Sequence, residues 1–169
     1  MTNILKAVRG LDLHDCWVGA GFVRNKIWDV KHGKDRTTLN DIDVVYFDKS
    51  NPDKKYDLEI ENKLKNFNSS LNWSVKNQSR MHFRNGHKQY TDCKQAIAHW
   101  PETATSIAVR LNFENKIEYI APYGLEDLFN LLVRPTPNFD LTTYNARIAN
   151  KKWKEKWSNL VIKTNHNPI

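Results

Sequence analysis

Residues 38–48 read TLNDIDVVYFD, and the run from Ile42 to Phe47 has, apart from one aspartate, the β-branched and aromatic composition of a buried strand. Two carboxylates, Asp41 and Asp43, stand one residue apart at its start. Side chains two positions apart in a strand point to the same face, so these aspartates project side by side. Adjacent carboxylates repel each other, and they are stable together where a cation lies between them or where water reaches the strand end. The stretch therefore predicts either a Mg²⁺ site or a solvated strand end.

A turn with two glycines precedes this strand. Residues 16–18 (CWV) have the composition of a short buried strand, and Gly19 and Gly21 follow. From residue 22 to residue 30 the apolar spacing is helical, and Gly33 is a suitable end for that helix. Glycines allow close approach of a ligand to the backbone, and the start of a helix offers amide groups to an anion. The turn predicts a phosphate site beside the carboxylates, although a tight turn can also serve packing alone.

The rest of the chain alternates helical and extended patterns. The predicted helices cover residues 4–8, 52–64, 124–132 and 144–161, and the predicted strands cover residues 73–77, 106–112 and 117–120. In the 52–64 helix, Leu58, Ile60 and Leu64 are expected to face the core. The absence of repeats and of composition breaks predicts a single domain over residues 1–169, with a C-terminal helical tail at about 140–162. The alternation predicts an α/β or α+β fold with a mixed central sheet and flanking helices.

Composition limits the class of protein. Of the 169 residues, 40% are hydrophobic and 27% are charged, which is typical of a folded, water-soluble domain and excludes an intrinsically disordered chain. No stretch reaches the roughly 20 apolar residues of a membrane span, so we expect a cytoplasmic protein without a membrane partner. Cys16 and Cys93 lack metal-binding spacing and are expected to be reduced thiols. The formal charge of +7 favours a polyanionic partner, either a nucleoside triphosphate or a nucleic acid, and leaves the oligomeric state open.

The combination of turn and carboxylate pair resembles the signature of the polymerase-β-like nucleotidyltransferase superfamily. Residues 18–25 (VGAGFVRN) are similar to the Gly-Gly-x-Val-Arg-Asp segment of CCA-adding enzymes and poly(A) polymerases, which carry their Asp-x-Asp on the next strand. From about Leu11 to Pro137 the chain resembles a family of small bacterial nucleotidyltransferase-like proteins. The segments that carry this resemblance are residues 19–29, 40–48, 75–82, 100–110 and 121–129.

The resemblance implies a polymerase-β-like nucleotidyltransferase fold and a set of roles. Asp41 and Asp43 would bind Mg²⁺ or Mn²⁺, the turn of Gly19, Ala20 and Gly21 would hold the phosphates of the nucleotide, and Arg24 would contact the triphosphate or order the turn. An arginine suits phosphate because its planar fork donates two parallel hydrogen bonds, although Arg24 can instead form a structural ion pair. The chain departs from the pattern at Ala20, where many members have glycine or serine, and at Asn25, where the CCA-type segment has aspartate.

The third metal-binding carboxylate of many superfamily members is missing from the 73–77 strand, where Ser74, Lys76 and Asn77 are the candidates. Glu118 is a possible substitute, although its alternation with apolar neighbours fits a solvent-facing residue equally well.

Further polar residues are candidates for nucleotide binding. Lys76, Asn77 and Arg80 crowd beside a strand end, where they can bind phosphate or base, or can satisfy one another at a strand-to-loop junction. Arg110 interrupts an apolar strand and is expected either to face the site or to form an ion pair. The tail KKWKEKW places Trp153 and Trp157 four residues apart, which indicates either an RNA-binding arm or a helix docked on its own domain.

We therefore predict a Mg²⁺-dependent nucleotidyltransferase that transfers a nucleoside monophosphate from a nucleoside triphosphate to an acceptor hydroxyl or phosphate and releases pyrophosphate. RNA, and tRNA in particular, is a reasonable acceptor for so basic a chain. Two alternatives remain at this point. The chain can be an inactive nucleotide- or RNA-binding module of the same fold, or a toxin that modifies tRNA.

Overall fold

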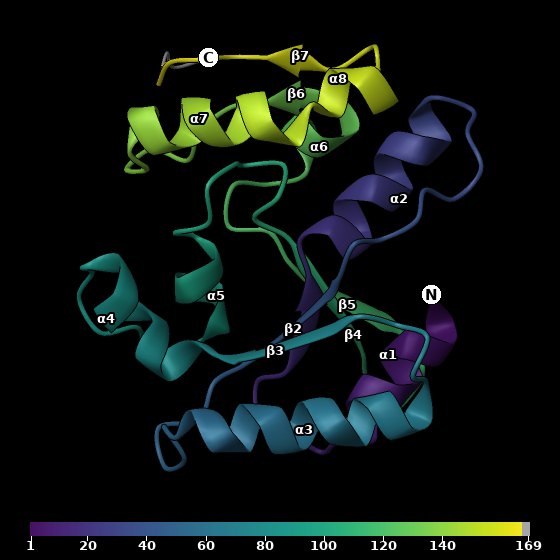
Figure 1. Cartoon of the computed structure of the whole chain (residues 1–169), viewed down its shortest axis with the longest axis vertical. Helices are drawn as coiled ribbons and strands as arrows, with labels where there is room; N and C mark the ends of the chain where they lie inside the picture. Colours follow the sequence, from purple (N-terminus) through teal and green to yellow (C-terminus); the bar gives the residue numbers. More distant parts are fainter. Residues whose placement is uncertain (167–169) are drawn as a thin grey trace.

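A computed structural model describes residues 1–166, and its centre is a mixed sheet of five strands in the order β3-β2-β1-β4-β5 (Figure 1). The strands are β1 (Trp17–Gly19), β2 (Ile42–Tyr46), β3 (Trp73–Asn77), β4 (Ala108–Leu111) and β5 (Ile117–Ile120). β2 and β3 run parallel, and the other neighbouring pairs are antiparallel. The predicted mixed sheet is therefore confirmed, and the strands predicted over 106–112 and 117–120 correspond to β4 and β5, which form an antiparallel hairpin.

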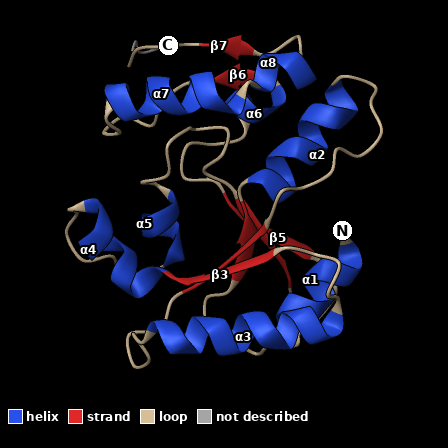
Figure 2. Cartoon of the chain, in the orientation of Figure 1, coloured by secondary structure: helices blue, strands red, loops and turns tan. Residues whose placement is uncertain are grey.

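Helices surround this sheet (Figure 2). They are α1 (Thr2–Arg9), α2 (Gly21–Lys31), α3 (Lys54–Phe67), the short 3-10 helix η1 (Gln78–Arg80), α4 (Met81–Asn85), α5 (Cys93–Ile97), α6 (Glu126–Phe129), α7 (Leu141–Lys151) and α8 (Trp153–Lys156). A second, two-stranded sheet pairs β6 (Leu132–Val133) with β7 (Val161–Ile162). In Figure 1, α3 lies below the central sheet, whereas α6, α7, α8 and the small sheet lie together above it.

Strand β2 separates two apolar clusters because its side chains alternate between the faces of the sheet. Ile42, Val44 and Tyr46 belong to the larger cluster, to which α1, α2 and α3 contribute. Val45 belongs to the smaller cluster on the opposite face, which α5 covers. Asp43 points to the same face as Val45, so this carboxylate projects away from the larger core, as the alternation of the strand predicts.

Three predictions about helices are wrong in detail. Leu58 is 50% exposed, because the buried stripe of α3 contains Asp57 and Ile60, and a residue two positions before Ile60 lies on the other side of a helix. The helix predicted over 124–132 ends at Phe129, since Leu131 has a positive φ of 58° and the chain then enters β6. The helix predicted over 144–161 breaks at Lys152, which has a φ of 47°, and the chain ends in α8 and β7.

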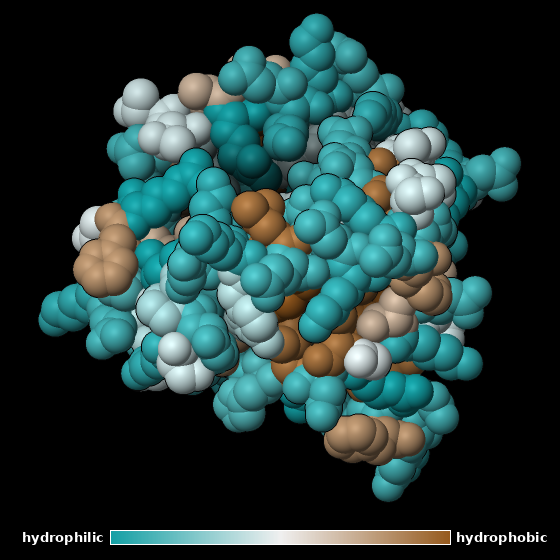
Figure 3. All heavy atoms as spheres, turned by 60° about the horizontal axis from the view of Figure 1, so that its bottom comes forward, coloured by the Kyte–Doolittle hydropathy of each residue, from teal (hydrophilic) through white to brown (hydrophobic). Residues whose placement is uncertain are grey.

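The surface is mostly hydrophilic. A view from below Figure 1 shows charged and polar side chains over most of this face, with hydrophobic atoms gathered in a hollow near its middle (Figure 3). None of the helices within residues 1–166 combines the length and the apolar composition that crossing a bilayer requires. The free thiols of Cys16 and Cys93 are both buried, and burial raises the pKa of the Cys16 thiol to about 12, so this thiol stays protonated at neutral pH.

Candidate active site

The two aspartates lie at the edge of a cavity where β2 begins. Asp41 immediately precedes β2, and Asp43 is its second residue, opposite Gly19 of β1 and Ser74 of β3. Burial of its carboxyl and, to a smaller extent, the neighbouring Asp41 carboxylate raise the pKa of Asp43 to about 6. The positive charges of Arg24, Lys76 and Arg147 act in the opposite direction on the same carboxyl. The pair therefore carries negative charge that the surrounding protein neutralises only in part.

The two glycines of the turn have different roles, one in packing and one in the wall of the cavity. A Cβ atom on Gly19 would lie 2.7 Å from the ring of Trp100, so this glycine is required for packing. A Cβ atom on Gly21 would meet only ordinary contacts, the nearest at 3.5 Å from Arg24, and Gly21 lines the cavity. Ala20 adopts a φ of 51° and a ψ of −122°, a strained conformation for any residue with a Cβ atom. Its carbonyl oxygen accepts the first bonds of α2, from the N–H groups of Val23 and Arg24, so α2 begins at the wall of the cavity.

Arg24 is buried and held on several sides. Its Nη1 donates to Thr105 Oγ1 at 2.9 Å, and its Nε and Nη2 donate to Asn25 Oδ1. The guanidinium carbon also lies 5.1 Å from the ring centroid of Trp28 and 4.4 Å from that of Trp153. Burial lowers the pKa of Arg24 to about 10, which still leaves a full positive charge at neutral pH. Arg24 is thus a fixed cation in the cavity wall. Asn25, which stands where the CCA-type segment named above has an aspartate, orders Arg24 by accepting its hydrogen bonds.

The cavity has a volume of about 270 Å³ and contains residues from distant parts of the chain. From the sequence-predicted set it brings together Ala20, Gly21, Arg24, Asp41 and Asp43. The opposite wall comes from α7, α8 and the residue after α8, and it consists of Arg147, Lys151, Trp153, Lys156 and Trp157. The sequence analysis interpreted the lysine-rich tail as an RNA-binding arm or as a helix docked on its own domain, and it missed the contribution of the tail to this cavity.

A buried carboxylate orients one of these additional cations. Glu102 is fully buried, and its Oε1 accepts a hydrogen bond from Arg147 Nε at 2.5 Å. The charge of Glu102 is therefore compensated by Arg147, and the pair lies close enough to Arg24 that Glu102 is the main carboxylate raising the pKa of Arg24. Arg147 Nη2 also donates to Glu102 Oε2 at 3.5 Å, and Arg147 lines the cavity.

Of the predicted nucleotide-binding residues Lys76, Asn77 and Arg80, only Lys76 lies near the carboxylates. It points to the same face as Asp43 and lowers the pKa of that residue. Asn77 is buried, and its side-chain amide donates to the carbonyl oxygens of Asp48 and Asn51. Arg80 forms an ion pair with Asp57 of α3. Both residues sit at the far end of β2 and β3, so the structure does not bring them to the cavity.

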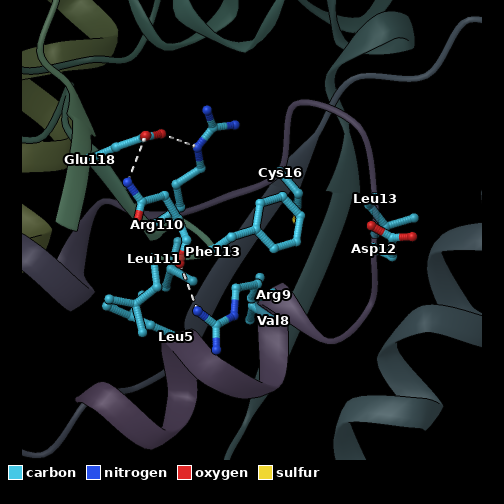
Figure 4. Close-up of a pocket in the computed structure, with 12 residues that line it drawn as sticks. Leu5, Val8, Arg9, Asp12, Leu13, Cys16, Arg110, Leu111, Phe113 and Glu118 are labelled. Atoms are coloured by element: carbon cyan, nitrogen blue, oxygen red, sulfur yellow. Dashed lines mark hydrogen bonds and ion pairs between the residues drawn. The ribbon is translucent and has the colours of Figure 1, made fainter. Parts of the chain in front are cut away.

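Arg110 and Glu118 belong to a different cavity, between α1 and the hairpin of β4 and β5 (Figure 4). Glu118 Oε2 accepts from Arg110 Nε at 2.7 Å, and the guanidinium lies over the ring of Trp17. β5 is three strands away from β2 in the sheet. The structure therefore places Glu118 and Arg110 away from the carboxylate cavity. Of the two roles expected for Arg110, it shows the ion pair, and Glu118 is the partner.

The remaining donor set fits a hard divalent cation. Within the part of the chain that the structure describes, no three His, Cys, Asp or Glu side chains gather closely enough to enclose a metal ion. Asp41 and Asp43 offer carboxylate oxygens beside an open cavity, and Mg²⁺ is commonly held by one or two carboxylates together with water and substrate phosphates. Burial and, to a smaller extent, the Asp41 carboxylate raise the pKa of Asp43, and a bound cation would act in the opposite direction.

The raised pKa of Asp43 predicts a pH-dependent stability of the metal-free protein. The folded state holds this proton up to about pH 6, whereas the ordinary value of the carboxyl is 3.8. The contribution of Asp43 to stability is therefore present below about pH 4 and is lost as the pH rises through 6. Relative to the native chain, Asp43→Asn should gain roughly 1–3 kcal/mol of unfolding free energy between pH 4 and pH 7 in chelator. Urea unfolding of both proteins across this range measures the difference, and a difference that does not change with pH would contradict the prediction.

Comparison with known proteins places this geometry in context. A family model described as a nucleotidyltransferase matches residues 6–162. A solved NMR structure, described as revealing a CCA-adding enzyme head domain, is 40% identical, covers 95% of this chain and 87% of its own, and superposes with a TM-score of 0.84. No curated protein sequence matches the chain.

Larger solved structures share the fold at lower identity. A CCA-adding enzyme in complex with CTP is 16% identical, with a TM-score of 0.63, over 96% of this chain and 39% of its own. The Thermotoga maritima CCA-adding enzyme complexed with tRNA is 17% identical, with a TM-score of 0.58, over 96% of this chain and 38% of its own. The chain thus spans about two fifths of these enzymes, and at such identities the likeness concerns the fold alone.

Proposed function

The chain belongs to a nucleotidyltransferase family, and from this premise we propose that it transfers a nucleoside monophosphate from a nucleoside triphosphate to an acceptor hydroxyl or phosphate. The observation that carries the proposal is the meeting of Asp41 and Asp43 with Arg24 and the start of α2 in one cavity. Negative oxygens for a metal ion and fixed positive charges for phosphates are the two requirements of this reaction.

Each group has a role in the proposed reaction. Asp41 and Asp43 hold a divalent cation, Mg²⁺ or Mn²⁺, which when bound supplies positive charge to the triphosphate. The amides at Gly21 and the guanidinium of Arg24 bind phosphate oxygens, with Lys76 nearby. The acceptor oxygen forms a bond to the α-phosphorus as the bond to the β-phosphate oxygen breaks, so pyrophosphate leaves with the electron pair and the acceptor proton passes to water.

The positive charge of the chain favours RNA as the acceptor, and tRNA is the particular RNA that we propose. Lys151 and Lys156 are exposed at the rim of the cavity, in a chain with a net charge of +7. The fold relatives include CCA-adding enzymes described with CTP and with tRNA. Both facts support a nucleic-acid acceptor that approaches over α8.

A binding module without turnover is the second candidate. The position opposite Asp43 on β3 is Ser74, which supplies no third carboxylate. A site with only two carboxylates can hold a metal–nucleotide complex and still fail to align the attacking oxygen.

The test is a transfer assay with each of the four labelled nucleoside triphosphates, total cellular RNA, and Mg²⁺ or Mn²⁺. The proposal expects metal-dependent transfer of label to RNA together with release of pyrophosphate from at least one nucleotide. Metal-dependent nucleotide binding without either product would favour the binding module. Neither binding nor release with any nucleotide would contradict both candidates.

A further inference from the structure

Asp29, near the end of α2, is a buried carboxylate at the junction of two walls of the cavity. It is 0% exposed, and its Oδ1 accepts from Trp157 Nε1 at 2.9 Å and from the Thr37 hydroxyl at 2.5 Å. Its Oδ2 accepts from the Thr37 backbone N–H at 2.8 Å. All three donors are neutral groups, so hydrogen bonds alone compensate the burial of this carboxylate.

Both segments that donate to Asp29 contain residues that line the cavity. Thr37 is followed by Thr38, Leu39, Asn40 and Asp41, all of which line it. Trp157 lines the cavity itself and follows Lys156, another lining residue. Residues 34–39 have no regular secondary structure, and α8 has four residues, so neither wall is fixed by a long element.

Other contacts join the same two segments. Lys34 Nζ donates to the carbonyl oxygen of Lys156. His32 Nδ1 lies 2.7 Å from the carbonyl oxygen of Trp28, which can only accept, so His32 Nε2 is free to accept the Asn159 N–H at 3.1 Å. The ring of Trp157 also packs edge to face on Trp28, with a centroid distance of 5.1 Å. In Figure 1 the upper end of α2 accordingly lies beside α8.

We infer that Asp29 is a positioning residue for nucleotide binding, because it holds the segment that ends in Asp41 and the segment that carries Lys156 at a fixed separation. The inference rests on the function proposed above. The carboxylate accepts all three hydrogen bonds, whereas an asparagine has one accepting oxygen. Its NH₂ group would therefore face either the Thr37 N–H or the two donors that Oδ1 now accepts from. Loss of one bond would let the metal-binding wall and the cationic wall drift apart, and both must meet one triphosphate.

The test compares Asp29→Asn with a matched control, Asp57→Asn. Asp57 is equally buried and accepts from Tyr46 Oη at 2.7 Å, from the Asn77 backbone N–H at 3.2 Å and from Arg80, but it lies at the other end of β2 and β3. Binding of the Mg²⁺ complexes of all four nucleoside triphosphates is measured by calorimetry. We expect Asp29→Asn to raise the dissociation constant roughly tenfold or more, and Asp57→Asn to leave it within about twofold of the native value, although both lower stability.

A second variant isolates the contact to α8. Trp157→Phe keeps an aromatic ring at this buried position and removes the N–H from which Asp29 accepts, with the loss of part of the packing of the larger indole. On its own it should weaken nucleotide binding. Combined with Asp29→Asn, it should cost less affinity than it does in the native chain, because both changes weaken the same link between the two segments. Amide hydrogen exchange without nucleotide should speed up in residues 37–41 and 153–160 in Asp29→Asn and stay unchanged there in Asp57→Asn.

Three results would overturn the inference: native affinity in Asp29→Asn, equal loss in both aspartate variants, or faster exchange in only one of the two segments. Failure of the native chain to bind any of the four nucleotides would be a different outcome, because it would remove the proposed function as well as the role of Asp29.

Discussion

Asp41→Asn and Asp43→Asn are each expected to slow nucleotidyl transfer by roughly a hundredfold or more while the chain stays folded. Each substitution preserves the shape of the side chain and removes one of the two negative charges at the cavity edge. Asparagine cannot replace a carboxylate as a ligand of a hard divalent cation without loss of affinity. Release of pyrophosphate from the nucleotide that the native chain prefers measures the effect, and circular dichroism checks the fold.

The matched control is Asp35→Asn, in the connection between α2 and β2. Asp35 is exposed and does not line the cavity, so its loss changes the net charge by the same amount without touching the site. Its rate should stay within about twofold of the native rate. Full activity in Asp43→Asn, or an equal loss in Asp35→Asn, would show that the carboxylate pair is not the metal site.

A chain that ends at Lys152 is expected not to fold cooperatively. Trp153, Trp157 and Leu160 are all at least 96% buried, and two of them pack on Trp28, which is itself fully buried. Truncation of one large buried side chain costs about 3–5 kcal/mol, so removing three costs about 9–15 kcal/mol, which is comparable with the whole of the roughly 5–15 kcal/mol that stabilises a typical domain. The shortened protein should show no sharp thermal transition by circular dichroism and should aggregate in size-exclusion chromatography.

The contrasting variant removes charge from the same segment without removing its apolar contacts. Replacing Lys151, Lys154 and Lys156 by glutamine should leave the melting temperature within a few degrees of the native value, because all three lysines are exposed. It should weaken binding of nucleotide and RNA. A truncated chain that melts cooperatively near the native temperature and loses only RNA binding would identify the tail as a nucleic-acid arm, and would contradict the docked arrangement.

Local sequence patterns predicted the parts of the fold that neighbouring residues determine. Asp43 faces away from the larger core because the strand alternates, and α2 starts directly after the glycine turn, as the helical spacing from residue 22 indicates. The same kind of pattern failed at Lys152 and Leu131, where a residue with positive φ interrupts a stretch of helical composition. Periodicity does not register such a residue, because neither is a glycine or a proline.

Candidate residues outside the turn and the carboxylate pair show a second limit of prediction from sequence, which concerns residue type. Arg80 and Glu118 are charged, near strand ends, and plausible as ligands by residue type alone. Each instead pairs with a partner, Asp57 or Arg110, that compensates its charge away from the cavity. Residue type indicates what a side chain can bind, whereas the partner that it contacts in the folded protein depends on how the strands are ordered in the sheet.

The sequence by itself determined the order of strand, glycine turn, helix and carboxylate strand, and with it the fold class and the family. Those features are local, since turn geometry and strand alternation depend on residues a few positions apart. Only the tertiary structure decided that Arg147 and Lys156 line the same cavity as Asp43, and that Asp29 joins their wall to the segment that ends in Asp41. These contacts join segments far apart in the chain, and they exist because Trp153 and Trp157 must be buried against Trp28, a packing requirement that no local pattern specifies.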